Sequence, residues 1–135
     1  MPDTFQLEIV TPEKMVVRAA AQEAQIPGRN GYFGVFPGHA PLITELGAGE
    51  ITYRSDGQEH HFSVAWGFAE ILPDRVTVLA ESVEKANEID ASRAQQSLAH
   101  AEESLKSAET EEDSAQALSK ISRAQARIEV AQKKQ

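Results

Sequence analysis

The 135-residue chain contains no cysteine, which excludes disulfide bonds, thiolate metal ligands and a cysteine nucleophile. Aromatic residues make up only 6%, with a single Trp, and no apolar run approaches the length of a membrane-spanning helix. Basic residues are outnumbered, 13 against 21 acidic ones, and the formal net charge of −8 disfavours free nucleic acid as a partner. The first residues, Met-Pro-Asp-Thr-Phe, lack the basic region and apolar core of a signal peptide. The composition is that of a globular domain, with or without an appendage.

The N-terminal part of the chain alternates apolar and polar residues with period two. Phe5, Leu7 and Ile9 fall on one face of the first segment, and Gly and Pro residues mark the breaks between later segments. Asp56-Gly57 lies between two alternating segments and predicts a tight hairpin turn. This pattern is typical of an antiparallel sandwich or barrel, and we interpret residues 1–84 as an antiparallel β-sandwich domain.

After Val83 the apolar period changes to that of a helix. Two stripes have alternating spacings of four and three: Ala94, Leu98, Ala101, Leu105 and Ala108, then Ala117, Ile121, Ala124, Ile128 and Ala131. Asn87 is a candidate cap for the first helix, and Thr110 or Ser114 for the second. Residues 85–135 are therefore expected to form an antiparallel α-helical hairpin.

The predicted hairpin has a weak apolar seam and segregated charge. Its stripes are mostly Ala, which buries little area, so the hairpin is expected to be held marginally; a modest but stable appendage is the alternative. Residues 84–113 hold nine acidic and three basic residues, a net charge of −6, whereas residues 114–135 hold five basic and one acidic, a net charge of +4. These charges can attract each other within a folded hairpin, or the basic end can meet an acidic surface elsewhere.

Residues 28–46 read GRNGYFGVFPGHAPLITEL and are dense in Gly and Pro. They predict a turn at 28–31, a short strand at 32–36 and a stiff loop at 37–41, which holds His39 at its tip. The residues alone favour a tight turn segment with a histidine on the surface. This sequence motif resembles the one that is characteristic of the epsilon subunit of F-type ATP synthases. The residues that match it are Gly31, Gly34, Pro37, Gly38, His39, Ala40, Pro41 and Leu42, and Gly49-Glu50-Ile51 follows them.

The resemblance implies a non-catalytic rotor subunit that acts in ATP synthesis and hydrogen ion transport. It implies a place in the central stalk, with the gamma subunit, the c ring and the beta subunits as partners, and a peripheral location on the cytoplasmic face of the bacterial plasma membrane. It places the end of the sandwich that carries Tyr32 and His39 on the polar loops of the c ring. It also implies that the two C-terminal helices switch between a folded hairpin and an extended form, and that they limit ATP hydrolysis.

A second motif, Ile-Asp-Ala-Ser-Arg-Ala at residues 89–94, opens the first predicted helix. Arg123 and Arg127 share a face of the second helix, and folding can bring both near Arg93. Physics alone favours surface salt bridges for these three residues, although Arg is well suited to hold phosphate. The motif resembles the ATP-binding motif of epsilon subunits, and the resemblance implies ATP as a regulatory ligand at these residues: Glu84, Ile89, Asp90, Arg93, Ala94, Arg123 and Arg127.

No constellation for catalysis or metal binding is visible. There is no phosphate-cradling Gly-rich loop and no nucleophile with a nearby base, so no catalytic residue and no required cofactor are expected. His60 and His61 are adjacent on a predicted strand and point to opposite faces, which argues against a shared metal ion. The alternative to a stalk subunit is a stand-alone module that senses a nucleotide or another anion.

Overall fold

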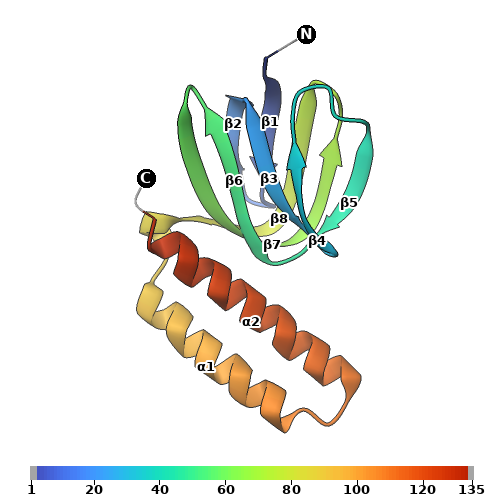
Figure 1. Ribbon diagram of the computed structural model, residues 1–135. Helices are drawn as coiled ribbons and strands as arrows, with labels where there is room; N and C mark the ends of the chain where they lie inside the picture. The colour runs from blue at the N-terminus through green and yellow to red at the C-terminus, as the bar shows by residue number, and fades with distance from the viewer. Residues whose placement is uncertain (1–2, 134–135) are drawn as a thin grey trace.

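The computed structural model describes residues 3–133, which form a curved sheet followed by two helices (Figure 1). The strands are β1 (Phe5–Val10), β2 (Met15–Ala21), β3 (Glu23–Gly28), β4 (Gly31–Val35), β5 (Leu42–Leu46), β6 (Gly49–Ser55), β7 (Gln58–Ile71) and β8 (Arg75–Lys85). A 3-10 turn, η1 (Ala86–Glu88), leads to α1 (Ala91–Ser107) and α2 (Glu111–Ala131). The predicted β-sandwich followed by a helical hairpin is confirmed.

The strands follow the order β2-β1-β8-β7-β5-β3-β4, and β6 pairs with both β3 and β7. Every neighbouring pair is antiparallel except β1 and β8, which run parallel from Gln6↔Arg75 to Val10↔Leu79. This pair departs from the antiparallel expectation because its two strands are joined through the whole sandwich and not by a hairpin. Figure 1 shows that the strands wrap around a common interior.

The interior of the sandwich holds the predicted apolar face of β1. Phe5, Leu7 and Ile9 are buried, as are Ile51 and Ile71 from later strands. Burying one such side chain contributes about 1.5–3 kcal/mol relative to leaving it in water. The cluster of buried core residues runs from position 5 to position 80, so the helices supply none of it. The sandwich therefore has a core that does not depend on the hairpin.

The turn between β6 and β7 has the predicted form. Ser55 pairs with Gln58, and Asp56 and Gly57 both have positive φ, at 51° and 76°. A two-residue loop with positive φ at both positions matches the right-handed twist of the strands that it joins. The Asp56-Gly57 prediction is confirmed.

The two helices pack through the predicted Ala seam, where Ala94, Ala101, Ala117 and Ala124 are buried. Thr110 caps α2 as expected, and its hydroxyl accepts a hydrogen bond from the Asp113 amide at 3.0 Å. No helix within residues 3–133 is both long and apolar enough to cross a membrane.

The predicted Asn87 cap of the first helix is wrong. Asn87 lies in η1, and α1 begins after Asp90, whose carboxylate accepts a hydrogen bond from the Arg93 amide at 3.1 Å. A carboxylate at this position also lies favourably at the positive end of the helix dipole.

Candidate functional site

α2 lies between α1 and the sandwich (Figure 1). Three sets of polar contacts join it to the strands. Near its middle, the Trp66 indole donates a hydrogen bond to the Ser119 hydroxyl at 2.8 Å. About two turns further on, Arg127 pairs with Glu84 through two hydrogen bonds of 2.8 and 3.3 Å. At the end of the helix, the Lys133 ammonium donates to both oxygens of Glu50 at 2.7 and 2.8 Å. We call this arrangement the docked hairpin.

A pocket of about 380 Å³ opens between the two helices and β7. The structure brings together in it the three predicted arginines, Arg93 from α1 and Arg123 and Arg127 from α2. The other lining residues are Trp66, Gln96, Ser97, His100, Ala101, Lys120 and Ala124. Four Lys or Arg side chains thus surround one opening in a chain whose net charge is −8.

Most of the positive charges that line this pocket are not paired with acidic side chains of the described residues. Arg127 is paired with Glu84, but no ion pair within residues 3–133 involves Arg93, Lys120 or Arg123. The Nε of Arg123 is buried and has no hydrogen-bond partner there. A buried donor without a partner is costly, because it has lost its bonds to water and gained none in return. An anion in the pocket would accept hydrogen bonds from the guanidinium and ammonium groups that line it, and would screen these cations from one another.

The remaining predicted site residues do not line this pocket. Ile89 and Ala94 are buried, and Asp90 is occupied as the cap of α1. Glu84 reaches the pocket indirectly, through its pair with Arg127. The pocket therefore contains the arginines of the predicted set, whereas Ile89 and Ala94 are buried and Asp90 is bound to the helix backbone.

Several pocket residues were not predicted from the sequence. Lys120, Arg123 and Arg127 are spaced three and four apart, and Arg93 and His100 are seven apart, so helical spacing could have found Lys120 and His100. Trp66 carried no comparable pattern, because a strand residue far away in sequence reaches the pocket only through the docking of α2.

Tyr32 and His39, the expected c-ring contacts, are not brought together. The β3–β4 turn lies at the end of the sandwich near the helices, whereas the β4–β5 loop lies at the opposite end (Figure 1). The Tyr32 hydroxyl accepts a hydrogen bond from the Glu50 amide at 2.9 Å, and the Gly38 amide next to His39 donates to the Pro73 carbonyl at 2.8 Å. The expectation that both residues share one end of the sandwich is wrong, because Tyr32 lies near the start of β4 and His39 lies in the loop that follows the end of this strand.

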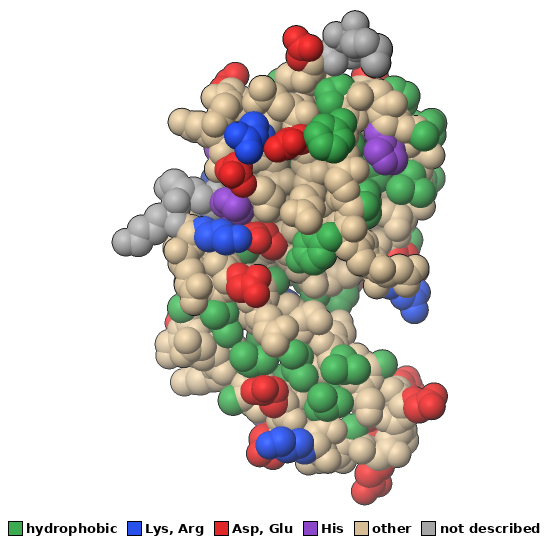
Figure 2. All heavy atoms as spheres, in the orientation of Figure 1, with side chains coloured by type: hydrophobic (Ala, Val, Ile, Leu, Met, Phe, Trp, Pro, Cys, Tyr) green, Lys and Arg blue, Asp and Glu red, His purple; other side chains and the backbone are tan. Residues whose placement is uncertain are grey.

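Hydrophobic side chains gather around a histidine on the β4–β5 side of the sandwich (Figure 2). Phe36, Leu42 and Ile43 are exposed there. Phe68 on β7 and Leu79 on β8 are also exposed and form a cross-strand pair. An exposed apolar area across three neighbouring strands is typical of a surface that binds another protein.

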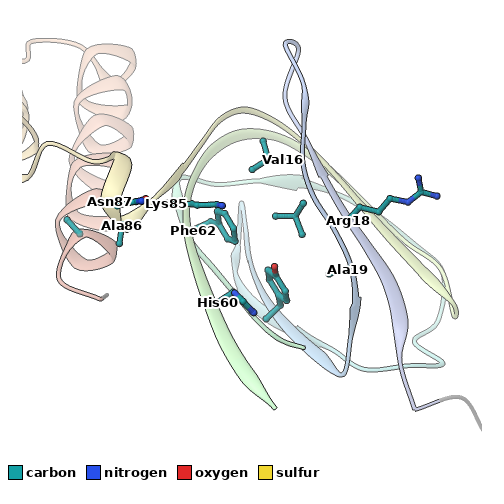
Figure 3. Close-up of a pocket in the computed structure, with 11 residues that line it drawn as sticks. Val16, Arg18, Ala19, His60, Phe62, Lys85, Ala86 and Asn87 are labelled. Atoms are coloured by element: carbon teal, nitrogen blue, oxygen red, sulfur yellow. The ribbon is translucent and has the colours of Figure 1, made fainter. Parts of the chain in front are cut away.

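A larger pocket, of about 770 Å³, lies between β2 and the β6–β7 hairpin and is closed on one side by η1 and Ala131 (Figure 3). Tyr53 stacks on His60 inside it, and burial raises the pKa of the Tyr53 phenol. Arg18 extends away from the opening (Figure 3). The walls of this pocket are mostly apolar and aromatic. They do not bring several charged side chains together, as the pocket with Arg93, Arg123 and Arg127 does.

The adjacent histidines lie on opposite faces of β7, as predicted. His60 stacks on Tyr53, whereas Nδ1 of His61 lies 3.1 Å from the Glu50 carboxylate. Among residues 3–133, no group of three or more His, Asp or Glu side chains is placed to hold a metal ion.

The chain matches two protein families end to end. Residues 4–86 match "ATP synthase, Delta/Epsilon chain, beta-sandwich domain", and residues 87–132 match "ATP synthase, Delta/Epsilon chain, long alpha-helix domain". The ATP synthase epsilon chain of Solibacter usitatus is 46% identical over 134 residues, which cover 99% of this chain and 100% of the relative. That of Koribacter versatilis is 57% identical over 101 residues, covering 75% of this chain and 71% of the relative.

Solved structures share the fold at low sequence identity. A chain of the Euglena gracilis mitochondrial ATP synthase aligns with a TM-score of 0.82 and 18% identity, over 98% of this chain and 84% of that one. A chain from the central stalk and c ring of the Tetrahymena thermophila enzyme aligns with a TM-score of 0.70 and 11% identity, over 94% and 96%.

The fold, a β-sandwich with a docked helical hairpin, is that of a small ATP synthase subunit. The chain belongs to the ATP synthase delta/epsilon family and resembles bacterial epsilon chains throughout its length. It is a non-catalytic component of that enzyme, and the resemblance found in its sequence is confirmed.

Proposed function

We propose that this chain acts in the central stalk of a bacterial F-type ATP synthase, where it joins gamma to the c ring and limits ATP hydrolysis through its helices. In this role it is peripheral to the cytoplasmic face of the plasma membrane and is held there by other subunits. We further propose that ATP binds the docked hairpin and regulates it. The observation that supports this regulation is the pocket in which Arg93, Arg123 and Arg127 converge.

ATP suits this pocket in charge and in the number of donors required. Arg guanidinium groups hold phosphate oxygens through paired hydrogen bonds, and about 380 Å³ lies within the usual range of ligand pockets. Arg93 comes from α1 and the other two arginines from α2, so an extended hairpin would separate them. A ligand at ten times its Kd would stabilise the docked form by about 1.4 kcal/mol.

The docked hairpin is also built to be released. Its seam between α1 and α2 is mostly Ala, and its contacts with the sandwich include the polar ones of Trp66, Glu84 and Glu50. Arg127 and Lys133 are already bound to carboxylates in this form. An acidic surface on a beta subunit would offer the same cations an equivalent partner, so the extended and docked forms would compete for them. Lys134, one of the five basic residues of segment 114–135, lies outside the described residues.

We propose that residues 1–84 and 85–135 are separable units, because the core of the sandwich contains no helix residue. We assign the gamma contact to the exposed apolar row formed by Ile43 on β5, Phe68 on β7 and Leu79 on β8, which are 70%, 53% and 54% exposed. A stalk subunit turns with its partner, so this contact must be stable, and a central apolar anchor provides stability.

Co-purification distinguishes this function from a stand-alone anion-sensing module. Co-expressed with gamma, the unmodified chain should be recovered bound to it. Phe68→Ser should weaken the complex by about 30-fold, the effect of losing an interface anchor worth about 2 kcal/mol. Leu118→Ser is the matched control, since Leu118 is 52% exposed but lies on α2. Recovery of the unmodified chain without gamma would favour the stand-alone module.

We propose that Tyr32 anchors the contact with the c ring. It is 53% exposed, and its turn carries Arg29 and Asn30, polar groups that suit the polar loops of a ring. His39 lies at the opposite end, and one flat surface cannot touch both ends. Tyr32→Ala should therefore release the catalytic head from the membrane sector, whereas His39→Ala should leave it attached.

The Tyr32 test needs a control for the hydrogen bond with Glu50. Tyr32→Phe removes the hydroxyl that accepts from the Glu50 amide but keeps the ring, so it should retain most of the attachment. Head retention is measured after washing membranes at low salt. If membranes with the Tyr32→Ala variant retain the catalytic head and membranes with the His39→Ala variant lose it, the c-ring contact lies at the end of the sandwich that carries His39.

A further inference from the structure

Trp66 occupies a strained position at a corner of β7. This strand runs first along β6 and then along β5, and Trp66 lies opposite the break between them. Its φ is 55°, a left-handed conformation that is an outlier for a bulky side chain, and the next residue, Gly67, has a φ of 142°. A Cβ on Gly67 would come within 1.9 Å of the Leu79 carbonyl oxygen, so no other residue fits the corner without a backbone shift. Such strain persists where the surrounding structure determines it, often at functional positions.

The corner directs the indole at α2. Its Nε1 donates to Ser119 at 2.8 Å, and the Arg123 guanidinium carbon lies 5.5 Å from the centre of the ring. Ser119 and Arg123 are four residues apart on α2 and therefore share a face. One strand residue thus fixes both the docking of the helix and the place of one arginine in the pocket.

The ring holds Arg123 in a way that a carboxylate could not. Glu84 occupies the donors of Arg127 with two hydrogen bonds, whereas a cation–π contact attracts the guanidinium through its face and leaves its N–H groups free. The Nε of Arg123 is buried without a hydrogen-bond partner in residues 3–133, although its charge is held in place. The pocket therefore contains one arginine that is positioned but still able to donate.

We propose that Trp66 is a positioning residue for nucleoside polyphosphates, and that it presents Arg123 to the phosphate groups. This inference rests on the proposed binding of ATP to the docked hairpin. Because the face of the indole is covered by Arg123 and its N–H is bound to Ser119, Trp66 does not stack on the base. Its contribution is specific to the phosphates, and it passes through Arg123.

The test compares three ligands on the full-length chain: ATP, tripolyphosphate and adenosine. Trp66→Leu removes the ring and should weaken the binding of ATP and of tripolyphosphate by about tenfold. This loss is within the range measured for cation–π contacts. Adenosine binding should not change. Trp66→Phe keeps a ring face but loses the N–H, and it should bind ATP within about threefold of the unmodified chain. Circular dichroism verifies that each variant keeps its sandwich and helices.

A double-mutant cycle separates positioning from general docking. In an Arg123→Ala background, Trp66→Leu should cause no further loss of ATP affinity, because the effect of the indole passes through that arginine. An additive loss would overturn the proposal, since it would mean that Trp66 acts only by holding the helix. Unchanged ATP affinity in Trp66→Leu would overturn it as well, while the ATP site itself would stand.

Trp fluorescence gives a second measurement that needs no variant of Trp66. The chain has a single Trp, so its emission reports on this corner alone. Saturating ATP should change the emission, because phosphate groups held by Arg123 alter the electrostatic field at the indole ring, and the change should vanish in Arg123→Ala. Emission that does not respond to bound ATP would overturn the positioning role. Absence of ATP binding to the unmodified chain would overturn the proposed nucleotide site, and this inference with it.

Discussion

A chain shortened to residues 1–87 should assemble normally and give an enzyme that hydrolyses ATP faster. Assembly should survive because the core of the sandwich runs from position 5 to position 80 and the exposed row of Ile43, Phe68 and Leu79 is retained. At low ATP the rate should rise by about tenfold, the effect of releasing an inhibited state that is favoured by about 1.4 kcal/mol. The measurement is ATP hydrolysis by the reconstituted enzyme over a range of ATP concentrations.

The dependence on ATP makes this prediction specific. At high ATP the hairpin is already held in the docked form, so removal of the helices should change the rate little. Glu50→Gln is a useful companion, because it weakens the Lys133 contact that holds the end of α2 to β6. It should favour the extended form and lower hydrolysis in the full-length enzyme. Equal hydrolysis by full-length and shortened forms at every ATP concentration would show that these helices are not inhibitory.

The second large effect is expected from removing two cations of the pocket. Arg123→Ala together with Arg127→Ala should weaken ATP binding by at least about 30-fold, since truncating one partner of a buried, hydrogen-bonded charge pair costs about 2–5 kcal/mol. Both side chains line the pocket, and the Nε of Arg123 is the buried donor without a partner. Equilibrium dialysis with labelled ATP measures the affinity.

Two checks accompany the double variant. Arg18→Ala with Arg29→Ala removes the same charge from the sandwich, where both side chains are about 70% exposed, and should leave ATP binding unchanged. The thermal transition of the sandwich should also be preserved, because neither Arg123 nor Arg127 belongs to its core. ATP affinity that is undiminished in the double variant would place the nucleotide elsewhere or nowhere on this chain.

The sequence predicted those parts of the fold that depend on local pattern. The alternation of Phe5, Leu7 and Ile9, the Asp56-Gly57 turn and the Thr110 cap each depend on a few neighbouring residues, and each is present as expected. The helix start was missed at Asn87, because Asp90 offers a stronger carboxylate cap three residues later. The parallel β1–β8 pair could not be predicted, since nothing local shows that the two distant strands meet.

The candidate site, like the fold, was predictable where it depends on local pattern. The convergence of Arg93, Arg123 and Arg127 follows from helical spacing and an antiparallel hairpin, and the structure contains it. Trp66 was missed because it reaches Ser119 from a strand more than 50 residues earlier in the chain. The separation of Tyr32 from His39 was missed for the opposite reason: residues close in sequence lie at the two ends of a strand.

Titration of the unmodified chain with ATP tests the central claim most directly, with the chain shortened to residues 1–87 as its partner measurement. Calorimetry should show saturable binding of one ATP per full-length chain, because the docked hairpin gathers Arg93, Arg123 and Arg127 around one pocket. The shortened chain lacks all three arginines and should give no heat of binding. The account would be contradicted if millimolar ATP gave no saturable heat with the full-length chain, or if the shortened chain bound ATP equally well.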